Sequence, residues 1–185
     1  MRTLLAPVAA CLGLLLLAAC ESESLVAPPP APSAPLVPLR PGAGEVFNEH
    51  DFSWSRLPGG GAIQGVLTYR SPEGLRYLCR GRDVILIPET PWVRRRMFIL
   101  YGSMTSAQVP ADIVRARTPA ASAGDYASYA RKTVCDTANR FSFPNLPDGG
   151  WYVITLAHPA DNSEATMAIM RRVETHGGPR SVVLN

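Results

Sequence analysis

The stretch between residues 139 and 156 restricts most strongly what this chain can fold into. Phe141 and Phe143 alternate with Ser142, and a second run, W-Y-V-I-T-L, begins at Trp151. Pro, Asn, Asp and Gly residues separate the two runs, and these residue types favour turns. Side chains two positions apart point to the same face of a strand, so Phe141 and Phe143 share one face. The pattern predicts two strands joined by a turn.

Short runs of similar character recur along the chain. They are rich in branched or aromatic side chains and are separated by Gly, Pro, Asn or Asp. Short strands between turn signals are typical of a single antiparallel β-sandwich, the architecture of immunoglobulin-like domains. The further expected strands cover residues 62–69, 75–79, 83–88, 166–173 and 181–184.

One helix is expected inside this series of strands. Thr90 can cap its start, Pro91 suits its first turn, and Gly102 suits its exit. Four apolar side chains in the segment share one helical face, at the spacing i, i+4, i+7 and i+8. They are Val93, Met97, Leu100 and Tyr101.

The segment after this helix has a different composition. Residues 103–124 are rich in Ala, Ser, Thr and Pro and are expected to form a loop. Residues 125–132 are expected to form a second short helix. The role of the whole insertion, residues 90–133, is left open by the sequence.

The amino terminus has the pattern of a secretory signal peptide. Arg2 precedes an apolar run of about 16 residues, which is shorter than the roughly 20 that a membrane-spanning helix needs. The run ends in Leu17-Ala18-Ala19-Cys20, which resembles the lipobox of bacterial lipoproteins. The resemblance implies that residues 1–19 are removed and that Cys20 becomes the lipidated first residue. A membrane helix, or an ordinary signal peptide with a chance cysteine, are the alternatives.

The expected location follows from this lipobox. An aspartate after the lipidated cysteine often retains such proteins at the inner membrane, and Glu21 is a weak version of that signal. We therefore expect an outer-membrane lipoprotein that faces the periplasm, with the inner membrane as the alternative.

A linker separates the anchor from the folded domain. Residues 20–44 contain seven prolines between Pro28 and Pro41. Proline lacks an amide hydrogen and fixes φ, so the segment favours extended polyproline II. We expect a passive spacer, and a proline-rich ligand for a partner is the alternative. Residues 45–185 are then expected to form one β-sandwich domain, because about 140 residues suffice for one core. The whole chain, with 46% apolar and 18% charged residues, is also too apolar to be wholly disordered.

The segment from Asn139 to Val153 also carries a family resemblance. It is similar to the "G-x-F-x-F-x-x-L-P-x-G-x-Y-x-V" hairpin of carboxypeptidase-regulatory-like and transthyretin-like β-sandwiches, although Asn139-Arg140 replaces the usual glycine. Residues 62–67 and 84–88 resemble the opening pair of strands in those domains. The match covers about 60 residues in two blocks. It implies a transthyretin-like, non-catalytic module used for binding, assembly or support.

Two of the four cysteines remain for the folded domain. Cys11 lies in the signal peptide and Cys20 in the lipobox, which leaves Cys79 and Cys135. An exported protein meets an oxidising compartment, so we expect these two to form a disulfide. Two separate buried thiols are the alternative.

The sequence offers little for catalysis, metals or nucleic acid. The three histidines lie far apart, so no metal site or cofactor is expected. His158, Asp161 and Ser163 crowd into one turn, whereas triad members converge from separate rigid elements. We therefore expect that the protein is not an enzyme. The net charge of +3 is too small for a general nucleic-acid binder.

Five side chains are candidates for partner contact. Arg94, Arg95 and Arg96 form either a solvated helix face or a contact for an acidic partner, such as lipid phosphate or an anionic polysaccharide. Trp54 and Trp92 either pack in the core or stack on sugar rings.

These observations favour a lipid-anchored accessory protein that docks to an envelope complex or polymer. A glycan-binding lipoprotein, or a small secretion-system lipoprotein with a transthyretin-like fold, are the alternatives.

Overall fold

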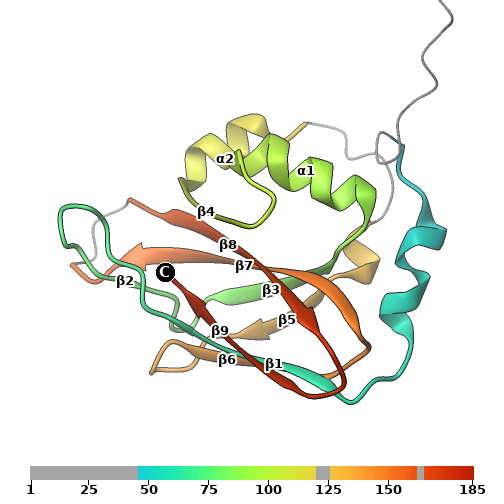
Figure 1. Cartoon of the computed structure of the whole chain (residues 1–185). Coiled ribbons are helices and arrows are strands. Elements are labelled where there is room, and N and C mark those ends of the chain that lie inside the picture. Colours follow the sequence, from blue (N-terminus) through green and yellow to red (C-terminus); the bar gives the residue numbers. More distant parts are fainter. Residues whose placement is uncertain (1–45, 120–125, 162–164) are drawn as a thin grey trace, which may run out of the picture. The chain divides into compact units, whose positions relative to one another are not determined.

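The computed structural model describes residues 46–119, 126–161 and 165–185. The predictions for the signal peptide, Cys20 and the linker lie outside these residues. In the part described, two β-sheets stack face to face and a layer of helices covers the outer face of the larger sheet (Figure 1). No helix within these ranges is long and apolar enough to cross a membrane.

The smaller sheet has three strands in the order β6-β1-β9. They are β1 (Gly61–Leu67), β6 (Arg140–Leu146) and β9 (Pro179–Leu184). β1 pairs antiparallel with β6 but parallel with β9, which corrects the expectation of a wholly antiparallel sandwich. The chain reaches β9 by a short turn from a strand of the other sheet, so β9 takes its direction from that strand rather than from β1.

The larger sheet has the order β4-β8-β7-β3-β5, and β2 pairs separately with β7. All its pairs are antiparallel, and β7 is the strand with the most partners. Its strands are β2 (Tyr77–Leu78), β3 (Asp83–Pro88), β4 (Ser106–Pro110), β5 (Arg131–Val134), β7 (Gly149–Pro159) and β8 (Met167–Thr175).

The predicted turn between residues 146 and 149 is present, but it does not close a hydrogen-bonded hairpin. β6 belongs to the smaller sheet and β7 to the larger one, so the turn carries the chain from one layer to the other. Asn145, with φ 56°, adopts the left-handed conformation that asparagine tolerates. Phe141 and Phe143 both point into the core between the sheets, as predicted. Membership of the transthyretin-like family stays a prediction.

Apolar side chains pack on both faces of the larger sheet. On β7, Trp151 and Val153 enter the core between the two sheets, and Tyr152 between them enters the core under the helices. All three are fully buried. This explains why the segment reads as a continuous apolar run rather than as an alternation of apolar and polar residues.

The helix predicted from residue 90 is confirmed as α1 (Pro91–Tyr101). The Val93 amide donates to Oγ1 of Thr90 at 3.1 Å, and Gly102 ends the helix with φ 73°. The four apolar side chains predicted to share the inner face are all buried.

The other local predictions need correction. The expected loop at 103–124 contains β4 and a second helix, α2 (Ala111–Arg117). The expected helix at 125–132 is a 3-10 turn, η2 (Tyr126–Tyr129), followed by β5. Both β4 and β5 are edge strands, and their pairing with β8 and β3 outweighs their weak local preferences. A further 3-10 helix, η1 (Glu49–Arg56), precedes β1.

The predicted disulfide between Cys79 and Cys135 is confirmed, with the two Cα atoms 5.7 Å apart. Cys79 follows β2 and Cys135 follows β5, so the bond closes a loop that contains both α-helices. Asn139, with φ 60°, lies beside it, and its buried side-chain oxygen accepts from the Cys79 amide at 2.9 Å.

Replacing both Cys79 and Cys135 with serine should lower the free energy of unfolding by about 4 kcal/mol, because the unfolded chain loses a closed loop. Urea denaturation of the variant and of the oxidised parent measures this difference. If the two free energies of unfolding differ by less than about 1 kcal/mol, the bond does not stabilise the fold by lowering the entropy of the unfolded chain.

Gly65 of β1 lies next to the ring of Phe141, and a β-carbon at position 65 would collide with that ring. We expect Gly65→Ala to destabilise the fold by roughly 1–3 kcal/mol through overpacking. Gly178→Ala is the matched control, since a β-carbon at Gly178 meets no atom within 4 Å. Equal thermal transitions for the two variants would contradict the packing argument.

Candidate functional site

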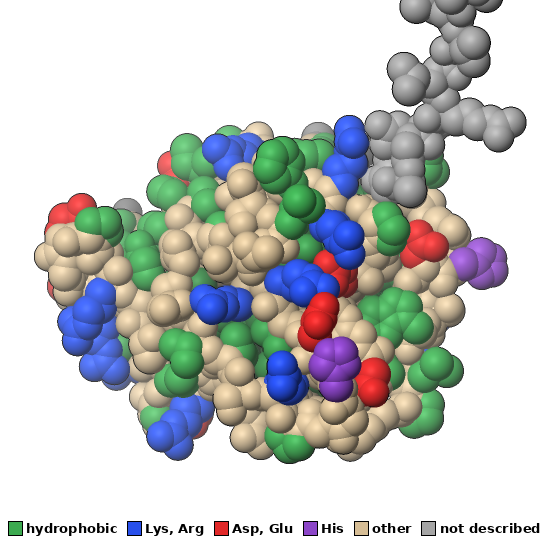
Figure 2. Space-filling model, in the orientation of Figure 1, with side chains coloured by type: hydrophobic (Ala, Val, Ile, Leu, Met, Phe, Trp, Pro, Cys, Tyr) green, Lys and Arg blue, Asp and Glu red, His purple; other side chains and the backbone are tan. Residues whose placement is uncertain are grey.

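The exposed face of α1 combines apolar and basic side chains. Pro91, Arg94, Arg95 and Phe98 recur at i, i+3, i+4 and i+7, which places them on one face. With Met104 they line a surface hollow of about 500 Å³, called here the α1 hollow. Figure 2 shows hydrophobic and basic side chains next to one another over the helix layer, at the top of the view.

The apolar part of the α1 hollow is unusually exposed for such large side chains. Phe98 is 56% exposed and Met104 is 45% exposed, and the neighbouring Ile99 is 51% exposed. Exposed apolar side chains that gather in one place mark interaction surfaces more often than single exposed ones do.

The three consecutive arginines do not form one patch. Arg94 pairs with Glu89, with its Nε 3.0 Å from the carboxylate, while Arg95 lines the α1 hollow. Arg96 turns the other way, and its guanidinium lies over the rings of Trp92 and Tyr126 at 5.3 and 5.1 Å. Arg94 and Arg95 therefore lie on the candidate surface, whereas Arg96 packs against two aromatic rings.

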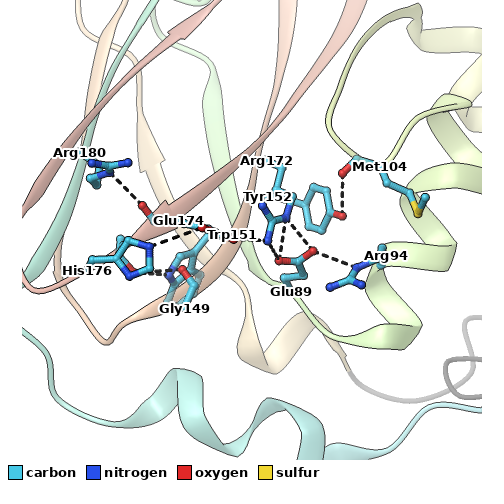
Figure 3. A network of polar contacts seen from close by, with 11 residues as sticks. Glu89, Arg94, Met104, Gly149, Trp151, Tyr152, Arg172, Glu174, His176 and Arg180 are labelled. Atoms are coloured by element: carbon cyan, nitrogen blue, oxygen red, sulfur yellow. Dashed lines mark hydrogen bonds and ion pairs between the residues drawn. The ribbon is translucent and has the colours of Figure 1, made fainter.

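A buried carboxylate supports this surface from below (Figure 3). The side chain of Glu89 is 7% exposed and accepts from Nε of Arg172 on β8, at 2.8 Å to each oxygen. Arg172 also pairs with Glu174, and this contact holds the pKa of the Glu174 carboxyl below its usual value. Gly150 makes room for Glu89, since a β-carbon at position 150 would collide with the carboxylate.

Tyr152 links the same network to the segment that follows α1. Its hydroxyl donates to the carbonyl oxygen of Met104 at 3.0 Å. Burial, and after it the negative charge of Glu89, raises the pKa of Tyr152 to about 12. The folded state therefore favours the protonated phenol, so this contribution to stability is complete below pH 10 and is lost as the pH rises towards 12.

The two candidate tryptophans lie in different places. Trp92 lies on α1 and is buried in the core between the helices and the larger sheet, where its ring meets Phe47 edge to face and Tyr126 at a tilt. Trp54 packs partly buried against Trp151, at 5.0 Å between the ring centroids, beside the core between the sheets. They do not form one exposed platform, which is the arrangement that sugar stacking by these two rings would need.

The residues of the rejected triad offer no catalytic geometry in the part of the chain that is described. His158 lies on β7, and its buried Nδ1 has no hydrogen-bond partner there. Burial, and after it the nearby Arg82 and Arg80, lowers its pKa. Ser163 lies outside the described residues. Within them, no group of three His, Cys, Asp or Glu side chains could hold a metal ion.

No family model matches the chain, and no curated protein sequence matches it significantly. Among solved structures, the chain is similar to a proposed carbohydrate-binding protein from Pseudomonas aeruginosa. The two are 22% identical, the match covers 75% of this chain and 96% of that protein, and the TM-score is 0.48. A likeness at this level assigns no function to the chain.

Sequence reasoning found Arg94 and Arg95 but missed Phe98, Met104, Glu89 and Arg172. Phe98 could have been noticed as a large apolar residue outside the helical face of Val93 and Met97. Nothing in the sequence relates Glu89 to Arg172, because the contact joins residues 83 positions apart.

Glu89→Gln should destabilise the protein by about 2 kcal/mol, because Arg172 loses charge-assisted hydrogen bonds in a largely buried site. Arg94→Gln is the control. It removes the more exposed partner of the same carboxylate and should cost less than about 1 kcal/mol. Urea denaturation of both variants measures the two losses of stability. A larger loss for Arg94→Gln would contradict the view that the contact between Glu89 and Arg172 is the more important one.

Proposed function

We propose that this protein is a lipid-anchored, non-catalytic binding protein of the cell envelope, and that it docks to a partner protein through the α1 hollow. The observation that carries the proposal is the exposure of Phe98 and Met104 next to Arg94 and Arg95. Such a surface has an aromatic and apolar centre with arginines beside it, which is the composition of protein–protein interfaces.

The chemistry of the α1 hollow favours a protein over an anionic polymer. A polysaccharide or lipid phosphate would engage the two arginines but would leave Phe98 and Ile99 in water. A protein surface with an apolar side chain and flanking carboxylates would satisfy both parts, because arginine forks pair well with carboxylates.

The α1 hollow is also held in place before any partner arrives. Thr90 caps the helix. Glu89 accepts hydrogen bonds from both Arg94 of α1 and Arg172 of β8, and so links the helix to the sheet. The carbonyl of Met104 accepts a hydrogen bond from Tyr152. A surface ordered in advance loses less conformational entropy on binding.

The proposed location rests on the lipobox at residues 17–20. Lipidation at Cys20 would anchor the chain, and residues 20–44 would let the domain reach partners away from the lipid surface. We place the protein at the outer membrane facing the periplasm, with the inner membrane as the alternative because of Glu21.

Phe98→Glu in the full-length tagged protein should abolish co-purification of a stoichiometric partner protein from mildly solubilised membranes. Val183→Glu is the matched control, since Val183 is 45% exposed on β9, and it should retain the partner. Cys20→Ala should remove the protein from the membrane fraction. Both expectations are read by quantitative mass spectrometry of the eluates and fractions.

Three results would count against the proposal. Retention of the partner by Phe98→Glu would remove the α1 hollow from the interface. Recovery of polysaccharide instead of protein would favour the glycan-binding alternative. An unchanged membrane fraction for Cys20→Ala would remove lipidation as the anchor.

A further inference from the structure

In the part of the chain that is described, the helix layer does not cover one end of the larger sheet. Towards α2, the side chains of Ile85 on β3 and of Ile154 and Leu156 on β7 form the floor of a cleft of about 510 Å³. Leu156 is 47% exposed there. We call this the α2 cleft, and it shares no lining residue with the α1 hollow.

Two arginines border this apolar floor. Arg82 comes from the turn before β3, and Arg115 comes from α2. Neither guanidinium has a hydrogen-bond or ion-pair partner among residues 46–119, 126–161 and 165–185. The acidic residue in the lining, Asp83, is paired with Lys132 at 3.2 Å. The α2 cleft therefore carries a net positive charge beside an apolar floor.

The backbone that presents Arg82 is tightly held. The Arg82 amide donates to the carbonyl of Cys79 at 2.8 Å, and the Cys135 amide donates to the carbonyl of Arg82 at 3.0 Å. The disulfide joins these same two cysteines. On the other side, the Ala111 amide at the start of α2 donates to the carbonyl of Thr166 at 2.9 Å, which ties α2 to the chain just before β8. Both walls are thus positioned without a ligand.

We propose that the α2 cleft binds an amphipathic carboxylate, meaning a carboxylic acid with an aliphatic chain. Its head would lie between Arg82 and Arg115, and its chain would cover Ile85, Ile154 and Leu156. The volume falls in the range of small-molecule sites, and an apolar floor with few charged groups is their usual lining.

Three other classes of ligand fit the lining of the α2 cleft less well. Inorganic phosphate would engage the arginines but leave the apolar floor in water. A neutral lipid would cover the floor but leave two charges without partners. Among the described residues, no aromatic side chain lines the α2 cleft, so they offer a sugar ring no stacking surface.

A diazirine-bearing fatty acid, added to membranes that contain the full-length protein, tests this inference. Photolysis should label the β7 segment, residues 149–159, in a saturable way. Dodecanoate should compete with the label, and dodecanol should compete at least tenfold less well, because it lacks the charge that the arginines recognise.

The variant Arg82→Gln/Arg115→Gln should reduce labelling about tenfold or more, since two charge-assisted contacts are lost. Arg76→Gln/Arg140→Gln removes the same charge from exposed positions elsewhere and should label normally. Leu156→Asn should weaken labelling while leaving both arginines in place. Circular dichroism of each variant confirms that it is folded.

Any of four results would overturn the assignment. Equal competition by dodecanoate and dodecanol would show that the arginines do not recognise the head group. Labelling that does not saturate, that falls outside β7, or that is unchanged in Arg82→Gln/Arg115→Gln would show that the α2 cleft is not the site.

Discussion

The burial of strand β7 on both faces is the constraint on which the rest of the structure depends. Trp151 and Val153 pack between the two sheets, and Tyr152 packs under the helices. Complete burial of one large apolar side chain contributes roughly 1.5–3 kcal/mol, so this one strand anchors both cores. Because β7 also pairs with β8, β3 and β2, the helix layer cannot shift without disturbing the sandwich.

The buried Glu89 carboxylate connects this core to the surface that we consider functional. It lies at the end of β3, is held by Arg172 of β8, and reaches Arg94 of α1. One charged group thus fixes three elements, and its partners satisfy the charge that burial would otherwise penalise. Residues of α1 line the α1 hollow, and residues of α2 line part of the α2 cleft. Both helices lie within the loop that the disulfide closes.

Several features could be predicted from the sequence because local chemistry decides them. Thr90, Pro91 and Gly102 mark the ends of α1 through capping and backbone conformation, and the structure has them in those roles. The pairing of Cys79 with Cys135 followed from elimination and compartment. The strands β4 and β5 could not be predicted, because they lie at sheet edges and gain their hydrogen bonds only from β8 and β3. The parallel pairing of β1 with β9 was missed for a related reason, since it depends on how the chain moves between layers.

The sequence by itself determined the strand-rich composition, the boundaries of α1, the disulfide and the positions of the charged residues. The strands and the helix boundaries depend on short-range properties such as alternation, capping and turn preference, whereas the disulfide follows from the number of cysteines left in an exported domain. Only the tertiary structure decided which charges face one another and which apolar side chains remain exposed. Arg96 is drawn onto Trp92 and Tyr126, Glu89 meets Arg172, and Phe98 is left on the surface. Each outcome depends on the packing of distant segments, and the order of residues along the chain does not encode it locally.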